Sequence, residues 1–136
     1  KGQVYAIEKK EDALALLKEN RRKFATDNLE IVSGTAPEAM VELPVPTHAF
    51  IGGSSGNMNE IIRLLLDKNP GVRIVINCIT LETVAEAMNA IRDFSLTDVD
   101  IVQLSAARSK SIGRYHMMMG ENPIYIISCS GRGEEI

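Results

Sequence analysis

Residues 48–79 read HAFIGGSSGNMNEIIRLLLDKNPGVRIVINCI, and this stretch indicates the fold of the whole chain. A short apolar run ends in the glycine- and serine-rich segment 52–56, and apolar residues then recur at helical spacing over 58–68. An Asn-Pro-Gly sequence at 69–71 ends that helix. The β-branched run 73–79 predicts a central strand that is buried on both faces. Strand, helix and strand in this order are typical of a parallel β-α-β unit.

The same alternation extends in both directions along the chain. We expect further strands and helices, with one helical turn, at these positions: strands 4–7, 29–32, 99–106 and 123–129; helices 11–24 and 81–94; turn 37–40. This order predicts an α/β fold, with a mostly parallel sheet and helices on both faces. The link 107–123 has no helical pattern, so we expect an irregular connection and a last strand that runs antiparallel to the others.

The two later helices should each bury one apolar stripe. In helix 58–68, Ile61, Leu64 and Leu65 lie on one side and should face inward. In helix 81–94, Val84, Met88 and Ile91 form the corresponding stripe, and Thr80 is a good N-cap.

Length and composition fit one globular domain over residues 1–136. The formal charge is −3, aromatic residues make up 4% and Trp is absent, which argues against a nucleic-acid partner and against stacking platforms for bases. Apolar runs are of strand length, far below the roughly 20 residues of a membrane span, so no membrane partner is expected. The chain has no initiator Met and starts inside strand-like sequence. We therefore expect either that a leader has been removed or that the chain is part of a longer protein.

The two cysteines, Cys78 and Cys129, lie in strand-like runs without a CxxC or Cys/His cluster. We interpret them as buried hydrophobic residues in a reducing cytoplasm, and no metal site is expected.

Residues that follow strands are the candidates for ligand binding, because ligands of open α/β sheets bind at the carboxyl ends of strands. Glu8 could accept hydrogen bonds from ribose hydroxyls, although a strand-end Glu is more often simply solvated. The small residues of 34–36 would let a flat ring approach the backbone, and they equally fit an ordinary turn. The loop 52–56 offers exposed N–H groups and room for a ligand, but it is neither a P-loop nor GxGxxG.

The segment 108–116, RSKSIGRYH, is a local positive patch in a chain of net negative charge. Its arginines could bind a multiply anionic small molecule, and the alternative is a solvated basic loop. Met117, Met118 and Met119 fit core or subunit-interface packing better than a cofactor box. The residues alone therefore indicate a nucleotide-like ligand and an anionic partner in an α/β fold.

Six segments together resemble a known family. The stretches VYAIE, GTAPEA, FIGGSSG, NCITLET, VQLSAARSKSIGRYHM and NPIYIIS occur in the order and spacing of the cobalamin-pathway precorrin methyltransferases, of the CbiT type and of the C-terminal domain of the CobL type. The resemblance covers essentially the whole chain, and FIGGSSG and the stretch around Arg108 to His116 are its most specific parts. It implies a Rossmann-like class I methyltransferase that uses S-adenosylmethionine to methylate C15 of a precorrin and to decarboxylate the C12 acetate. It also implies a cytoplasmic homo-oligomer, commonly a tetramer.

The resemblance implies cofactor-binding roles by position. Glu8 corresponds to the acid that binds the ribose hydroxyls. Gly34, Thr35 and Ala36 correspond to the adenine-side loop, although many relatives have Asp where this chain has Thr35. Gly52 and Gly53 lie beside the transferred methyl group.

Substrate-binding roles fall on later segments. Ser54, Asn77 and Thr80 face the macrocycle by the same correspondence. Arg108 and Arg114 are assigned to the substrate carboxylates from their charge. His116 is the nearby side chain that titrates near neutrality, so we expect it to orient or protonate the acetate arm as the catalytic residue.

The chain departs from the family at its start. The first strand and the D-x-G-x-G-x-G loop of the family are missing, and the missing strand would lie in the middle of the sheet. We therefore expect a gap in the sheet and a truncated chain that is itself inactive and binds the cofactor poorly. Two alternatives stay open: a non-catalytic α/β module that binds a nucleotide or docks a partner, and a dinucleotide-dependent oxidoreductase domain.

Overall fold

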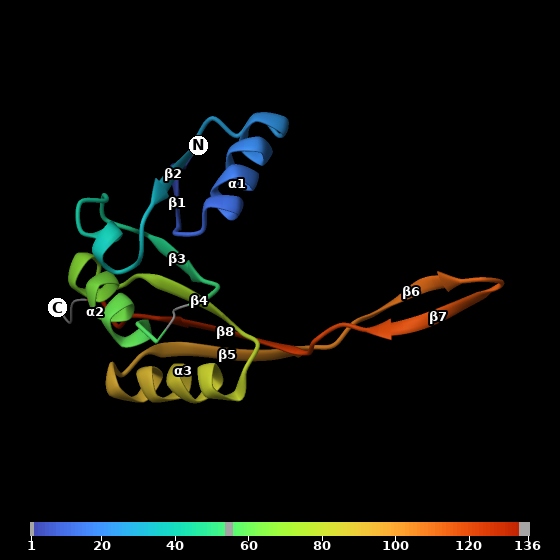
Figure 1. The fold of residues 1–136 in the computed structure, drawn as a ribbon. Coiled ribbons are helices and arrows are strands. Elements are labelled where there is room, and N and C mark those ends of the chain that lie inside the picture. The colour runs from blue at the N-terminus through green and yellow to red at the C-terminus, as the bar shows by residue number, and fades with distance from the viewer. Residues whose placement is uncertain (1, 54–55, 134–136) are drawn as a thin grey trace. The chain divides into compact units, whose positions relative to one another are not determined.

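The computed structural model describes residues 2–53 and 56–133. Strands and helices alternate along the chain as far as α3, and strands alone follow it (Figure 1). The chain divides into two compact units, Lys1–Pro44 and Val45–Ile136. The single domain expected from the sequence stays a prediction.

The first unit is built on two parallel strands. Strand β1 (Val4–Glu8) pairs with β2 (Leu29–Ser33), and α1 (Glu11–Lys23) connects them. Acidic residues lie in the first turn of α1 and basic residues in its last turn, as the helix dipole favours. A short 3₁₀ turn, η1 (Glu38–Met40), follows β2 where a helical turn is predicted.

The second unit contains a four-stranded sheet in the order β3-β4-β8-β5. Strands β3 (His48–Ile51) and β4 (Arg73–Cys78) are parallel. Strand β8 (Ile124–Ser130) runs antiparallel to β4 on one side and to β5 (Thr97–Leu104) on the other. The predicted antiparallel last strand is therefore confirmed.

Two helices and one face of this sheet form the core. Helix α3 (Leu81–Asp93) packs against β4, β8 and α2 (Met58–Lys68). The buried side chains of the sheet alternate along the strands, and the largest in the core include Ile62, Ile74, Ile76, Ile127 and Met58.

Burial differs from the sequence prediction at three places. In β4 it alternates strictly, so the expectation of a strand buried on both faces is wrong: Arg73, Val75 and Asn77 are only half-buried. In α2, the inward side includes Ile62, while Leu64 is only half-buried.

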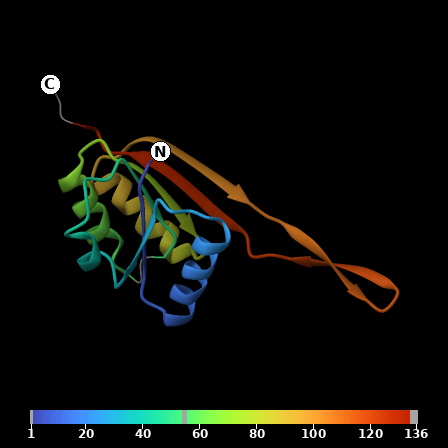
Figure 2. The same cartoon turned by 90° about the horizontal axis from the view of Figure 1, so that it is seen from above.

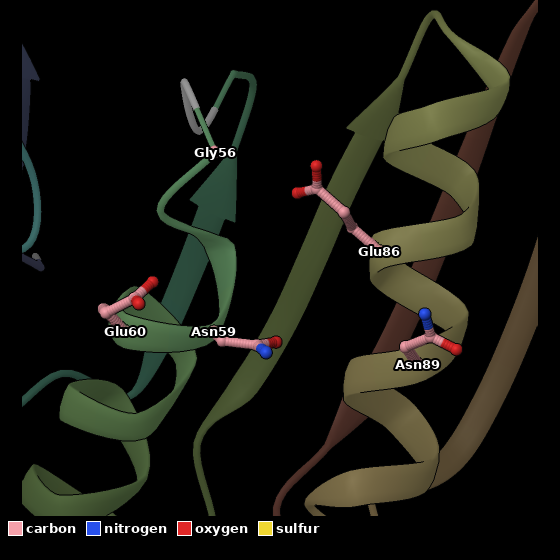
Figure 3. A pocket seen from close by; sticks show the side chains of 5 residues that line it. All are labelled: Gly56, Asn59, Glu60, Glu86 and Asn89. Atoms are coloured by element: carbon pink, nitrogen blue, oxygen red, sulfur yellow. The ribbon is translucent and has the colours of Figure 1, made fainter.

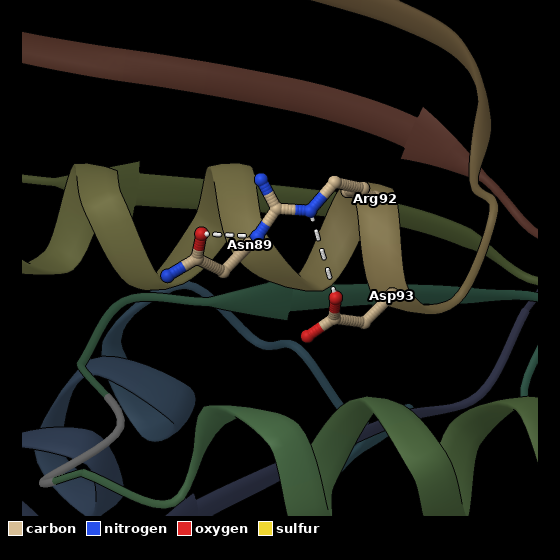
Figure 4. Close-up of polar contacts among 3 residues, drawn as sticks. All are labelled: Asn89, Arg92 and Asp93. Carbon is tan, nitrogen blue, oxygen red and sulfur yellow. Dashed lines mark hydrogen bonds and ion pairs between the residues drawn. The ribbon is translucent and has the colours of Figure 1, made fainter.

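In α3 the prediction is wrong for Met88, which is 43% exposed; Val84 and Ile91 are half-buried, and the fully buried residues are Ala87 and Ala90. Small side chains let α3 approach its neighbours closely. At the exposed end of α3, Arg92 Nη2 donates to Asn89 Oδ1 at 3.0 Å and Arg92 Nε lies 3.7 Å from Asp93 Oδ1 (Figure 4). Exposed pairs of this kind contribute little to stability.

The end of β8 closes tightly on the loop before β4. The Gly131 N–H donates to the Val72 carbonyl at 3.0 Å, and the Gly133 N–H donates to the Pro70 carbonyl at 2.9 Å. A Cβ on Gly131 would collide with the Pro70 carbonyl oxygen and lie 2.7 Å from Leu66 Cδ2. Glycine is thus required here by a close backbone approach.

The link 107–123 is a β-hairpin, and the expectation of an irregular connection is wrong. Strand β6 (Ala107–Ile112) pairs antiparallel with β7 (Tyr115–Gly120). Gly113 has φ +58° and begins a two-residue connection, as in a type II′ turn. All residues of the hairpin are exposed, and both views show it extending beyond the ends of β5 and β8 (Figures 1 and 2).

Across the described residues, backbone pairing gives three separate sheets: β1-β2, the four-stranded sheet and the hairpin. The sequence predicts one mostly parallel sheet with a strand absent from its middle. In the same residues, no helix combines the length and apolarity that a membrane crossing requires.

Candidate functional site

Glu8 lies at the carboxyl end of β1 in a turn that fixes its carboxylate. The backbone N–H groups of Lys9 and Lys10 both donate to Glu8 Oε1, at 2.9 and 3.0 Å. These N–H groups, that of Lys10 foremost, hold the pKa of the Glu8 carboxyl below its ordinary value. A carboxylate can accept about four hydrogen bonds, so this anion keeps acceptor capacity for ligand hydroxyls.

Gly34 brings the end of β2 to Glu8. Its N–H donates to the Glu8 carbonyl at 3.0 Å. The φ of Gly34 is +155°, and a Cβ there would lie 3.0 Å from Ala39 Cβ. Thr35 follows, and its carbonyl accepts from the Ala39 N–H at 2.9 Å, so Thr35 and Ala36 lead directly into η1. Within the first unit, the loop 34–36 therefore begins next to Glu8.

In the second unit, Gly52 and Asn77 meet at the carboxyl edge of the sheet. Ile51 pairs with Ile76, so the register continued by one residue places Gly52 beside Asn77. A Cβ on Gly52 would lie 3.2 Å from Phe50 Cε1, which shows that the ring occupies the space of a side chain. Gly53 follows and has open space around its Cα. Ser54 lies outside the described residues.

The Thr80 hydroxyl is hydrogen-bonded, whereas the Asn77 side-chain oxygen accepts no hydrogen bond from the described residues. Thr80 Oγ1 accepts from the Thr83 N–H at 3.1 Å and lies 2.9 Å from Thr83 Oγ1, so the predicted N-cap of α3 is confirmed. Asn77 Oδ1 is buried, and no described residue donates a hydrogen bond to it.

The basic candidates lie on the hairpin. Arg108 pairs with Met119, and Ser111 pairs with His116. Because adjacent residues in a strand point to opposite faces, Arg108 and His116 lie on opposite faces of the hairpin, and Arg114 lies in its turn. Arg108, Arg114 and His116 of one hairpin therefore do not form a single cluster.

The hairpin nevertheless starts from the edge of the four-stranded sheet at which Gly52 and Asn77 lie. Leu104, the last residue of β5, pairs with Ile124, and Cys78, the last residue of β4, pairs with Tyr125. The carboxyl ends of β4 and β5 thus share one edge, and the hairpin leaves the sheet there.

A polar pocket that the sequence does not predict lies between α2 and α3. It has a volume of about 160 Å³ and is lined by Gly56, Asn59, Glu60, Glu86 and Asn89 (Figure 3). Glu86 and Asn89 are three positions apart and therefore share one face of α3. This spacing was the sequence signal from which a polar surface on the helix could have been predicted. In the parts of the chain that the structure describes, no three His, Cys, Asp or Glu side chains are grouped to hold a metal ion.

The chain matches known proteins over almost its whole length. Residues 1–130 match the family model described as precorrin methyltransferase domain. A probable cobalt-precorrin-6B C(15)-methyltransferase (decarboxylating) of Methanothermobacter thermautotrophicus is 39% identical over 126 residues, which are 91% of this chain and 65% of that protein. The chain thus spans just under two thirds of the length of this curated relative.

Solved structures agree in fold. The precorrin-6y C5,15-methyltransferase of Geobacter metallireducens superposes with a TM-score of 0.85 at 32% identity, covering 95% of this chain and 68% of that one. A SAM-dependent O-methyltransferase of Thermotoga maritima gives a TM-score of 0.70 at 16% identity, over 99% of this chain and 52% of that one, and so shares the fold alone. The chain has the class I methyltransferase fold and belongs to the precorrin methyltransferase domain family.

Proposed function

We propose that this chain takes part in S-adenosylmethionine-dependent methylation of a precorrin at C15, with decarboxylation of the C12 acetate, in cobalamin biosynthesis. The observation that carries the proposal is the family match over residues 1–130. The matched region includes the hydrogen bond from Gly34 to Glu8 and the neighbouring strand ends at Gly52 and Asn77. We place the protein in the cytoplasm, because Cys78 and Cys129 are free and buried.

The geometry of the first unit fits a nucleoside cofactor. The Glu8 carboxylate, oriented by two backbone N–H groups, would accept hydrogen bonds from the ribose hydroxyls. Gly34, Thr35 and Ala36 follow β2 beside Glu8 and are proposed to face the adenine. Gly52 and Gly53 would line the methyl end. When bound, S-adenosylmethionine supplies an electrophilic methyl group, and the residues need only hold the two reactants in line.

Substrate binding is assigned to the carboxyl edge of the larger sheet and to the hairpin. Ser54, Asn77 and Thr80 are proposed to face the macrocycle, and Arg108 and Arg114 to bind its acetate and propionate carboxylates. His116 is proposed to orient or protonate the acetate arm. If His116→Ala retains full decarboxylation, that role for His116 is refuted.

We also propose that the protein is a homotetramer and that the hairpin forms the subunit contact. Large apolar side chains are exposed along it, including Tyr115 at 78% and Met118 at 64%. Exposed apolar patches and open strand edges mark association sites. Sedimentation equilibrium should show a tetramer, and Met118→Lys should shift it to smaller species. An unchanged assembly of Met118→Lys would contradict the hairpin contact.

The activity is tested on the protein expressed from its natural gene. Incubation with S-adenosylmethionine and either cobalt-precorrin-6B or the metal-free precorrin should give a product that has gained one methyl group and lost CO₂, detected by mass spectrometry. Binding of S-adenosylhomocysteine without turnover of either precorrin would instead favour a non-catalytic nucleotide-binding module.

A further inference from the structure

Asn77 is a polar residue in an apolar strand. It follows Ile74, Val75 and Ile76 in β4, and it pairs with Ile126 of β8. Asparagine is disfavoured in strands, where β-branched residues such as those before it fit best. An apolar residue at this position would therefore suit the sheet better than the amide does.

The amide also carries an unmade hydrogen bond. Asn77 Oδ1 is buried and accepts no hydrogen bond from the described residues. A buried acceptor without a partner has lost its hydrogen bonds to water and costs folding free energy. Buried polar groups in proteins are nearly always paired, so this exception requires a reason.

Two other polar residues of the second unit have their hydrogen bonds satisfied. Asn69 Nδ2 donates to the Pro46 carbonyl at 2.8 Å, and Asn69 Oδ1 accepts from the Gly71 N–H at 3.0 Å. Thr80 Oγ1 caps α3. Thr80, just after β4, thus has a structural role, whereas Asn77 Oδ1 accepts no hydrogen bond from the described residues.

The position of Asn77 points to a ligand as the missing partner. It lies beside Gly52 at the carboxyl edge of the sheet, where ligands of open α/β sheets bind. An amide oxygen accepts and cannot donate, so carboxylates, which only accept, are excluded as its partner.

We propose that Asn77 Oδ1 accepts a hydrogen bond from an N–H group of the bound ligand. This inference rests on the proposed function. The N–H group can come from two sources, the amino groups of the cofactor or a ring N–H of a metal-free tetrapyrrole, and the experiment distinguishes them.

The first measurement is the thermal stability of the protein expressed from its natural gene, with no ligand added. Asn77→Leu keeps the shape of the side chain and removes the unpaired acceptor, so the melting temperature should stay the same or rise. Asn69→Leu is the matched control: it breaks two hydrogen bonds and should lower the melting temperature by several degrees. If Asn77→Leu lowers the melting temperature as much as Asn69→Leu does, the Asn77 amide is structural and the inference is overturned.

The second measurement is binding of two probes, S-adenosylhomocysteine by calorimetry and uroporphyrin III by absorbance. Asn77→Leu should weaken one of them by about 3- to 10-fold, the loss of one hydrogen bond. Weaker binding of S-adenosylhomocysteine identifies the cofactor as the source. Weaker binding of uroporphyrin III, with no change for its copper complex, which lacks ring N–H groups, identifies the macrocycle.

The outcomes separate the inference from the proposed function. Unchanged affinities for both probes in Asn77→Leu overturn the inference and leave the function standing. Binding of neither probe by the unaltered protein overturns the proposed function, and the inference falls with it.

Discussion

Replacing Gly34 by alanine should weaken the contact between the end of β2 and Glu8, in which the Gly34 N–H donates to the Glu8 carbonyl. At φ +155° an L-residue is strained, and the new Cβ would lie 3.0 Å from Ala39 Cβ, closer than the neighbouring backbone allows without a shift. Strain of this kind costs about 1–3 kcal/mol. The tight contact adds to that cost. The lower entropy of the unfolded alanine chain offsets about 0.4–1 kcal/mol.

The net destabilisation of the first unit is therefore about 2 kcal/mol, which corresponds to about 30-fold faster exchange of its protected amides. Native-state hydrogen exchange read at β1 and β2 measures this directly. Gly2→Ala is the matched control, because a Cβ at Gly2 would meet nothing within 4 Å. If Gly34→Ala changes exchange by less than about 3-fold, the argument from backbone conformation is wrong.

Three further predictions concern stability. Gly131→Ala should lower the free energy of unfolding by about 2–3 kcal/mol in urea denaturation, because its Cβ collides with the main chain of Pro70; no change would refute the close approach. Thr80→Ala should lower the free energy of unfolding in urea by about 1 kcal/mol, because the hydrogen bond from the Thr83 N–H is lost. Thr80→Asp, which can still accept that bond, should keep most of this stability; equal losses in the two variants would refute the capping role. The pKa of Glu8 is below its ordinary value in the folded chain, so its stabilisation is present above that value and is lost as pH falls through the folded pKa. The Glu8 carboxyl, followed by NMR during an acid titration, should show a pKa below its ordinary value. Glu8→Gln should remove the corresponding loss of stability at low pH.

The parallel unit 48–79 could be predicted because every local signal in it agrees. The apolar run, the glycine-rich loop, the helical spacing and the Asn-Pro-Gly end all indicate the same β-α-β path, and β3, α2 and β4 confirm it. The antiparallel direction of β8 followed from the absence of a helix between it and the preceding strand.

The hairpin was missed because its strands carry little apolar alternation. Residues 107–112 are mostly polar, and Met117 to Met119 form a continuous run, so neither strand shows a period of two. The available signal was Gly113 between two segments of equal length, which is typical of a two-residue hairpin connection.

Burial was harder to predict than the elements themselves. Periodicity placed Val84, Met88 and Ile91 on one face of α3, but Ala87 and Ala90 make the close contacts. The apolar residues of β4 likewise predicted burial on both faces of the strand, but burial alternates and only one face is fully buried. The unpaired Asn77 oxygen is invisible in the sequence, since it depends on what surrounds the strand end.

The position of β8 constrains the order in which the chain can fold. Strand β5 pairs with β8, and β8 also pairs with β4, so in the described sheet β5 is joined to the rest through a strand made some twenty residues later. During synthesis, β5 and the hairpin leave the ribosome while the place of their neighbour in the sheet is still vacant. Assembly of the larger sheet must therefore wait for residues 124–130. Until then, the edges of β4 and β5 that β8 later covers are open to pairing with other strands.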